Sequence, residues 1–238
     1  MKPRALRTAA ALGALLVTLT ALTSSAASLS LTSQNFTPYL TCTVTATPAT
    51  TTAVIDTTVK QGNANGNFGA VNTFTVSSGN TVNQRIYIKF DLTTCSPAIP
   101  ATATVRLATL RLYVTVLPAA CRTIDIFPVT ASWTELAITW NTQPFGTTIN
   151  NPASGSRTGT FNVGTPAGCQ NLAAGYVVGA TVTTDVQAFV AGSSTNFGWM
   201  LRDDVEGSAT TRTDTYSAKE LATIAQEPQL VVTYVTVP

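Results

Sequence analysis

Polar side chains alternate along two β-type stretches and provide the clearest candidate chemistry of this chain. Arg85, Tyr87 and Lys89 alternate with apolar residues in one stretch, and Arg111 and Tyr113 do so in another. A guanidinium pairs with a carboxylate through two parallel hydrogen bonds, and a tyrosine ring covers an apolar face while its hydroxyl stays in water. If both stretches lie in one sheet, the five side chains form a single surface that suits a carboxylate-bearing ligand.

Two other interpretations of this alternation remain open. The five residues also fit an ordinary solvent-facing sheet surface. They equally fit a second buried layer, lined by cationic side chains that lay their apolar stems over other groups.

Nucleophilic catalysis of the common kinds is excluded by composition, because the chain has no histidine. Neither a Ser-His-Asp nor a Cys-His arrangement can be built without it. Paired carboxylates remain a route to glycoside cleavage, and the only acidic cluster is Asp203-Asp204-Val205-Glu206. We interpret this cluster as a solvated turn and predict that the protein is not an enzyme.

The sequence gives little support for a metal site. Asp56 is followed by Asn63, Asn65 and Asn67, which offer oxygen ligands for a hard cation such as Ca²⁺. The spacing lacks the closing glutamate of an EF-hand, and alternating Asn and Gly are what tight turns require. We therefore expect no cofactor, with structural Ca²⁺ at Asp56 as the weaker alternative.

Four cysteines indicate two disulfides. They are Cys42, Cys95, Cys121 and Cys169. The chain has neither a CxxC spacing nor a histidine, so a zinc site has no support. An even number of cysteines in an exported chain is typical of disulfides. Three pairings are possible, and the sequence does not choose between them.

Residues 1–27 have the pattern of a secretory signal peptide. Lys2, Arg4 and Arg7 precede an apolar run, and Ser25-Ala26-Ala27 supplies small residues for cleavage. An uncleaved membrane anchor is the alternative, and no later segment is long and apolar enough to span a bilayer. Without these three cations the charge count falls from 13 Lys+Arg against 11 Asp+Glu to a net −1, and no basic run remains for nucleic acid.

The remaining chain reads as many short strands separated by turns. Ile86, Ile88, Phe90 and Leu92 share one face of the first stretch, and Leu110, Leu112, Val114 and Val116 share one face of the second. With little helical periodicity outside 183–191, this predicts an all-β fold, an antiparallel β-sandwich of the jelly-roll kind, as a single domain over residues 51–238. Residues 28–50, rich in Thr, Ser and Pro, are expected to form an extended leader with a short strand at 40–45.

Eight sequence blocks in a fixed order carry a resemblance to a known family. The blocks are Ala53–Val59, Asn67–Gly69, Arg85–Leu92, Ala108–Tyr113, Trp133–Glu135 with Thr139–Asn141, Val182–Gln187, Asn196–Gly198 with Leu201-Arg202, and Tyr216–Glu220 with Pro228–Leu230. This order resembles the DNRLRE domain, a jelly-roll module related to carbohydrate-binding module family 96, over about residues 53–235. The resemblance implies that Trp133 and Trp140 are core or corner residues and that Glu135 and Asn141 satisfy backbone groups at a turn. The alternative is that Trp133, Trp140 and Trp199 are platforms for sugar rings.

The resemblance also implies a function. It predicts a secreted, non-catalytic module that binds an extracellular or cell-wall polysaccharide, with uronate polymers such as alginate among the ligands of the family. The alternative is a structural or adhesive surface protein that self-associates when the 28–50 leader adds a strand to a neighbouring subunit. A polysaccharide-degrading enzyme is the third class. The insert from Gly146 to Gly175 and the four cysteines lie outside the family pattern.

Overall fold

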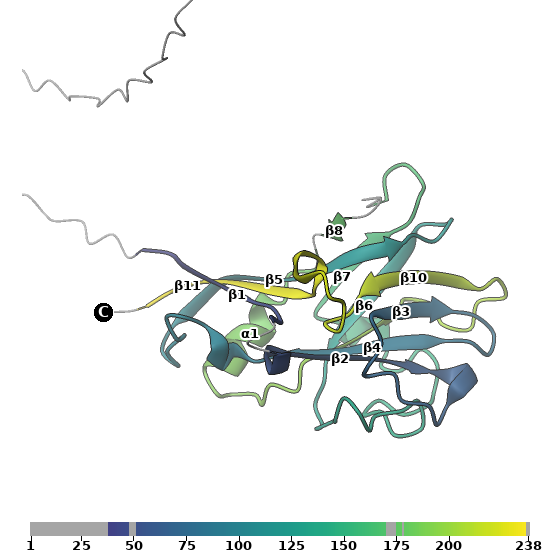
Figure 1. Ribbon diagram of the computed structural model, residues 1–238, viewed down its shortest axis with the longest axis horizontal. Coiled ribbons are helices and arrows are strands. Elements are labelled where there is room, and N and C mark those ends of the chain that lie inside the picture. The colour runs from purple at the N-terminus through teal and green to yellow at the C-terminus, as the bar shows by residue number, and fades with distance from the viewer. Residues whose placement is uncertain (1–37, 48–50, 170–174, 178, 237–238) are drawn as a thin grey trace, which may run out of the picture. The chain divides into compact units, whose positions relative to one another are not determined.

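The computed structural model describes residues 38–47, 51–169, 175–177 and 179–236, and these form two packed layers of antiparallel strands (Figure 1). The predicted signal peptide, residues 1–27, and residues 28–37 of the leader lie outside the described residues. In the described part of the chain, no helix has the length and apolar character needed to cross a membrane.

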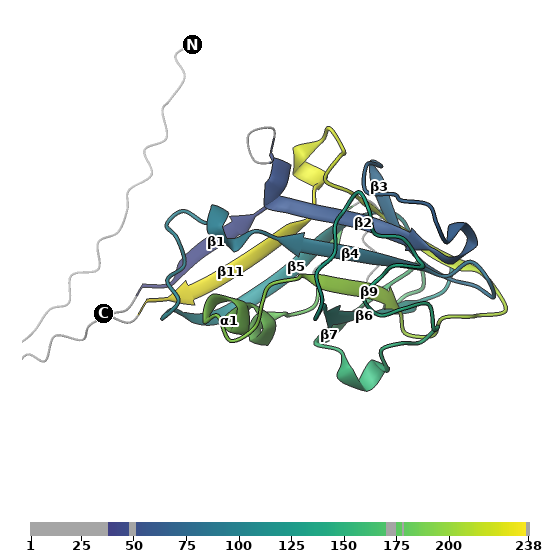
Figure 2. The same ribbon diagram turned by 90° about the horizontal axis from the view of Figure 1, so that it is seen from below.

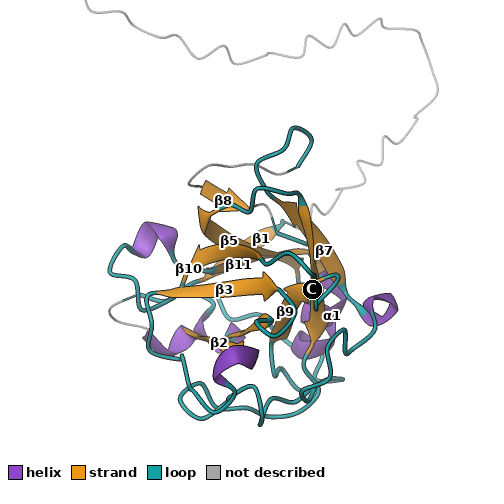
Figure 3. Cartoon of the chain, turned by 90° about the vertical axis from the view of Figure 1, so that its right-hand side faces the viewer, coloured by secondary structure: helices purple, strands orange, loops and turns teal. Residues whose placement is uncertain are grey.

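The first layer follows the strand order β1-β11-β5-β10-β3. These strands are β1 (Leu40–Val44), β11 (Gln229–Val235), β5 (Thr104–Val116), β10 (Arg212–Ser217) and β3 (Thr73–Ser78), with β8 (Gly175–Val177) attached to β5. The 13-residue strand β5 pairs with β11 through its first part and with β10 near its end. Figure 3 shows β10 and β11 of this layer above β2 of the other.

The second layer is built on β4, which pairs with β2 on one side and β9 on the other. Its strands are β2 (Val54–Lys60), β4 (Gln84–Phe90), β9 (Trp199–Asp203), β6 (Arg122–Pro128) and β7 (Gly159–Val163). Figure 2 shows β2, β4, β9 and β6 side by side. The β3–β4 pairing that joins the layers is the single pair Ser77↔Gln84. The predicted all-β antiparallel sandwich is therefore confirmed.

Short helices complete the fold. They are α1 (Thr183–Val190) and the 3₁₀ turns η1 (Thr51–Ala53), η2 (Gln61–Asn63), η3 (Leu92–Thr94), η4 (Ser154–Ser156) and η5 (Ile224–Gln226). The helix falls within the predicted helical stretch 183–191.

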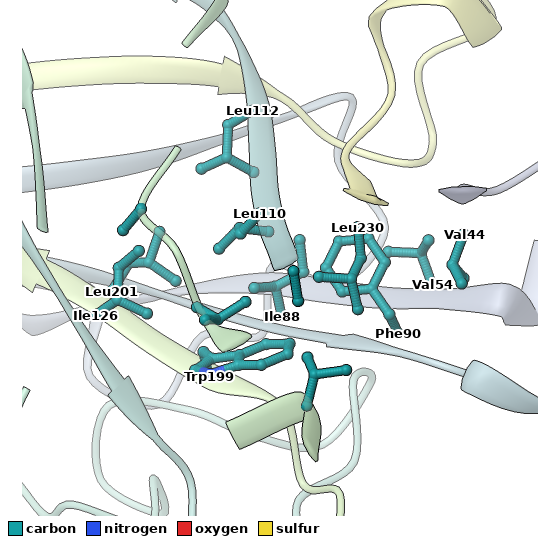
Figure 4. Packing of buried hydrophobic residues seen from close by; sticks show 14 of the residues in the cluster. Val44, Val54, Ile88, Phe90, Leu110, Leu112, Ile126, Trp199, Leu201 and Leu230 are labelled. Atoms are coloured by element: carbon teal, nitrogen blue, oxygen red, sulfur yellow. The ribbon is translucent and has the colours of Figure 1, made fainter. Parts of the chain in front are cut away.

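The main core lies between the layers and follows the alternation of the sequence. Ile86, Ile88 and Phe90 of β4 are fully buried against Leu110 and other inward residues of β5, and Figure 4 shows such side chains pointing toward one another from both layers. Burial of this apolar surface is the main force that holds the layers together.

Two of the predicted inward positions differ. Val116 is 52 % exposed, because it ends β5 where the register with β10 shifts between Thr215 and Tyr216. Leu92 begins η3 and is only partly buried, although it packs against the core.

Both predicted disulfides are confirmed, and their pairing is Cys42–Cys95 and Cys121–Cys169. The first joins β1, in one layer, to the chain that follows β4 in the other. Because β1 pairs with β11 along its whole length, residues 40–44 are the edge strand of the sandwich. The expected strand in the leader is therefore present, and the boundary at residue 51 leaves it out of the domain to which it belongs.

Candidate functional site

The outer face of the second layer is covered by the chain's own connection between β6 and β7, residues 129–158. We call the area beneath it the covered face; it is formed by Arg85 and Tyr87 of β4, Met200 and Arg202 of β9, and Asp125 and Phe127 of β6. All of these side chains are at most 1 % exposed. In Figure 1 the connection runs below β2 and β4. The sequence pattern placed Arg85 and Tyr87 on one face of β4 correctly, and the chain then buries that part of the face.

Arg85 is fully used inside the protein. Its guanidinium forms two hydrogen bonds with the Glu206 carboxylate, Nε to Oε1 at 2.7 Å and Nη2 to Oε2 at 2.8 Å. The remaining N–H groups donate to Gln143 Oε1 and to the backbone oxygens of Gly146 and Thr148. All five donors of the fork are satisfied, so Arg85 has no donor left for a ligand.

Tyr87 is buried beside Arg85. Its hydroxyl donates to Gln143 Oε1 at 3.1 Å, and its ring meets that of Trp133 edge-on with the centroids 5.7 Å apart. Burial raises the pKa of Tyr87 well above its ordinary value, because an apolar surrounding disfavours the phenolate. Tyr87 therefore holds the covered face together as a neutral hydrogen-bond donor.

Lys89, at the other end of β4, remains accessible and lines a hollow of about 400 Å³. We call it the Lys89 hollow; its lining includes Thr52, Ile55, Lys89, Asp91, Phe189 and Asn196, together with Leu92 and Thr93 of η3. Within the described part of the chain, the Lys89 ammonium makes no hydrogen bond or ion pair with protein.

Arg111 and Tyr113 lie on the outer face of the first layer, both partly exposed. Arg111 Nη1 donates to Gln229 Oε1 of the neighbouring strand β11 at 3.1 Å. Strands β10 and β3 separate β5 from β4 in the strand order, and both β4 and β5 turn their apolar faces into the same core. Their polar faces therefore point away from one another. The structure does not bring the five predicted residues onto one surface, and at Arg85 and Tyr87 it has the second buried layer that was the alternative interpretation.

The block containing Trp133 and Trp140 contacts the covered face. Trp140 is 2 % exposed and stacks against the Arg85 guanidinium, while Trp133 Nε1 donates to the backbone oxygen of Phe197 at 2.8 Å. Glu135 Oε1 accepts from the backbone N–H of Asp56 at 2.8 Å, and Asn141 Nδ2 donates to Asn65 Oδ1. Glu135 and Asn141 thus anchor the 129–158 connection on β2 and its following loop. Trp133 and Trp140 fasten it to the loop before β9 and to β4.

Asp56 meets other carboxylates rather than the asparagines that follow it. The carboxylate oxygens of Asp56, Glu135 and Glu220 lie within 4.8 Å of one another. Lys219 lies among them: its backbone N–H donates to Asp56 Oδ2 at 3.0 Å, and its ammonium contacts Glu135 Oε1 at 3.2 Å and Glu220 Oε1. Burial raises the pKa of Asp56 and of Glu135. This oxygen set suits a hard cation, but the Lys219 ammonium already contacts two of the three carboxylates.

The acidic cluster at 203–206 is not the solvated turn that we expected. Asp203 is 1 % exposed and pairs with Arg122, while Glu206 is 3 % exposed and pairs with Arg85. Only Asp204 and Val205 reach solvent. The difference arises because each buried carboxylate has a guanidinium partner far away in sequence, which compensates the loss of water.

The residues that line the Lys89 hollow beside Lys89 were not identified from the sequence. The alternation places Asp91 on the same face as Lys89, but Asp91 was not among the candidate binding residues. Phe189 and Asn196 come from α1 and the loop after it, and no local pattern links them to β4.

Comparison with models of known protein families gives a match over most of the chain. The model of carbohydrate-binding module family 96 matches residues 47–234, a range that contains strands β2 to β10 and nearly all of β11 but not β1. No curated protein matches the chain.

Proposed function

The chain belongs to carbohydrate-binding module family 96, and on this premise we propose that it is a secreted, non-catalytic module that binds an extracellular or cell-wall polysaccharide. The observation that carries the proposal is the family match over residues 47–234. Two disulfides agree with an oxidising compartment. The buried carboxylates Asp125, Asp203 and Glu206 are held by guanidinium groups, which supports a structural rather than a catalytic role for them.

The expectation that the bound polysaccharide is acidic has less support from the structure than from the sequence. It depended on Arg85, Tyr87, Lys89, Arg111 and Tyr113 acting together, and two of these are now bound within the covered face. Lys89 in its hollow and the Arg111–Tyr113 pair on β5 remain as two separate candidate surfaces, and the proposal does not require both.

The test is native electrophoresis of the secreted, non-reduced protein through gels that contain polysaccharides of different classes. We expect retardation by at least one polysaccharide, with no release of reducing ends or unsaturated sugars from it. Unretarded migration in every gel would contradict binding. Release of sugar products from a bound polymer would instead support the enzyme class.

A structural or adhesive role is the second candidate, and one observation favours it. β1 stands at the end of the strand order and pairs with β11 alone among the described strands, which leaves one edge for strand addition. The test deletes residues 28–37 and leaves β1 and Cys42 intact. If the leader joins subunits, the full-length protein elutes at high mass and the deleted form elutes as a monomer. If both elute alike, this role is rejected.

A further inference from the structure

The Lys89 hollow exists because β9 is shorter than β4. β9 begins at Trp199, opposite Ile88. At Lys89, β4 is therefore paired with Ile55 of β2 on one side and, among the described strands, has none on the β9 side. The chain there is the loop before Trp199. Asn196 Nδ2 donates to the backbone oxygen of Phe90 at 2.8 Å and fixes this loop to the end of β4.

Glycine is required where this loop enters β9. Gly198 has φ +76°, and a Cβ at this position would lie 2.1 Å from the backbone oxygen of Ile88. Asn196 Oδ1 accepts from the Gly198 N–H at 3.0 Å. The wall of the hollow is therefore held by hydrogen bonds on both sides of Asn196, and the hollow is pre-formed rather than created by a ligand.

We propose that the Lys89 hollow is the sugar-binding subsite of the module and that it takes an uncharged pyranose residue rather than a uronate. This rests on the proposed function, because it assumes that a polysaccharide is bound. It commits to one of the two candidate surfaces and to the class of ligand.

The lining has the groups that a neutral sugar ring uses. The Lys89 ammonium donates to ring or hydroxyl oxygens, and the Asp91 carboxylate accepts from sugar hydroxyls through charge-assisted hydrogen bonds. Asp91 Oδ1 already accepts from the N–H and hydroxyl of Thr93 at 2.9 and 2.7 Å, which fixes the orientation of this carboxylate. Ile55 and Phe189 offer apolar surface for the C–H groups of the ring.

Charge decides the class of ligand. Lys89 and Asp91 lie two residues apart on the same face of the chain and both line the hollow, so the site carries one positive and one negative group. No other ionisable group lines it among the described residues. A uronate carboxylate would be attracted by Lys89 and repelled by Asp91. The hydroxyls of a neutral sugar can form favourable hydrogen bonds with both groups.

The experiment compares wild-type protein with Lys89→Met, Phe189→Ala and a matched control, Arg212→Met. Arg212 is also a half-buried cation in a hollow, on β10 and away from β4. The probes are a neutral β-glucan, xylan or mannan and the polyuronates alginate and polygalacturonate, tested by affinity electrophoresis and titration calorimetry. We expect a neutral probe to bind. Lys89→Met should weaken binding about tenfold or more and Arg212→Met should leave it unchanged, because the loss of a charged hydrogen bond costs that much.

Phe189→Ala also removes a packing contact, since the Phe189 and Trp199 rings lie 5.5 Å apart. Lys89→Met therefore carries the test if Phe189→Ala lowers the melting temperature. Binding of the neutral probe should change little between about 50 and 500 mM NaCl, whereas attraction between net charges would be screened over this range.

Asp91→Asn is the sharpest variant. Asparagine keeps the helix-capping oxygen of Asp91, so η3 should stay intact, and the hollow gains a net positive charge. Its affinity for polyuronate should rise relative to wild type. The inference is overturned if wild type binds polyuronates alone, or if Lys89→Met binds the neutral probe as wild type does; in both cases the proposed function stands. If no polysaccharide binds at all, both fail.

Discussion

The two ends of strand β4 carry cationic side chains that lie in different surroundings. Arg85 and Lys89 lie on the same face of the same strand, four residues apart. Arg85 is fully buried and its guanidinium is held by Glu206 and by the 129–158 connection. Lys89 is only partly buried, lines an open hollow, and forms no ion pair within the described residues.

The difference shows that strand alternation determines which side chains share a face, but not whether that face meets solvent. The covered end of β4 lies beside β9 and under the 129–158 connection. The connection supplies hydrogen-bond partners for Arg85 and Tyr87, and the chain after β9 supplies Glu206. At the open end β9 has not yet begun. Polar chemistry is therefore structural at one end of the strand and available to a ligand at the other.

The largest expected effect comes from breaking the covered end. Arg85→Met leaves the Glu206 carboxylate buried without its partner, which should lower the free energy of unfolding by about 3–5 kcal/mol. Urea denaturation at neutral pH measures this. Lys89→Met is the matched control and should change stability by no more than about 0.5 kcal/mol. Equal losses in the two variants would show that the two ends do not differ.

Asp214 is a buried carboxyl that can be compared with Glu206. Glu206 is paired with the Arg85 guanidinium, whereas Asp214 has a hydroxyl as its hydrogen-bond partner. Asp214 is 1 % exposed and accepts a hydrogen bond from the Tyr216 hydroxyl at 2.5 Å. Burial above all, opposed by this hydrogen bond and aided by the charge of Asp203, raises the pKa of Asp214 to about 7.

The sign of the pH effect follows from proton uptake. Between about pH 4 and pH 7 the folded state holds a proton on Asp214 that the unfolded chain has lost, so stability falls as pH rises through this range. Asp214→Asn keeps an acceptor for Tyr216 and removes the titration. Its stability relative to wild type should rise by about 4 kcal/mol between pH 4 and pH 8, measured by urea denaturation at each pH. A constant difference would contradict the buried, protonated carboxyl.

The open end of β4 is fastened covalently instead of by an ion pair. Cys95 follows η3, whose residues line the Lys89 hollow, and bonds to Cys42 of β1 across 53 residues of chain. Replacing both cysteines by serine should lower the free energy of unfolding by about 2–4 kcal/mol, because the unfolded chain gains freedom. The loss should be the same at low and high salt. A variant as stable as wild type would show that the sheet alone holds this end.

Much of the fold could be predicted from local pattern. The alternation in 85–92 and 109–116 predicted the buried faces of β4 and β5, and the scarcity of helical periodicity outside 183–191 predicted a sandwich, because both are properties of neighbouring residues. Cysteine count predicted two disulfides but not their partners, since pairing depends on which strands become neighbours.

The candidate site was less predictable, for a physical reason. Whether Arg85 binds a ligand depends on Glu206 and Thr148, which are far from it in sequence and on other elements. Phe189 and Asn196 reach the Lys89 hollow from α1 and its following loop, and no local spacing indicates this. The sequence identified residues with suitable chemistry. It could not show which of their hydrogen-bonding groups would be satisfied by other parts of the same chain.

The smallest expected effect comes from a variant that tests the covered end of β4 without disrupting its packing. Tyr87→Phe removes one hydroxyl and its hydrogen bond to Gln143 from the covered face but keeps the ring against Trp133. The cost should be about 1 kcal/mol, the usual net value of a buried neutral hydrogen bond. Thermal unfolding measures this loss, and calorimetry with a bound polysaccharide measures affinity, which should be unchanged because Tyr87 does not reach solvent. A Tyr87→Phe variant that folds with wild-type stability but loses its ligand would return Tyr87 to the binding surface and remove the distinction drawn along β4.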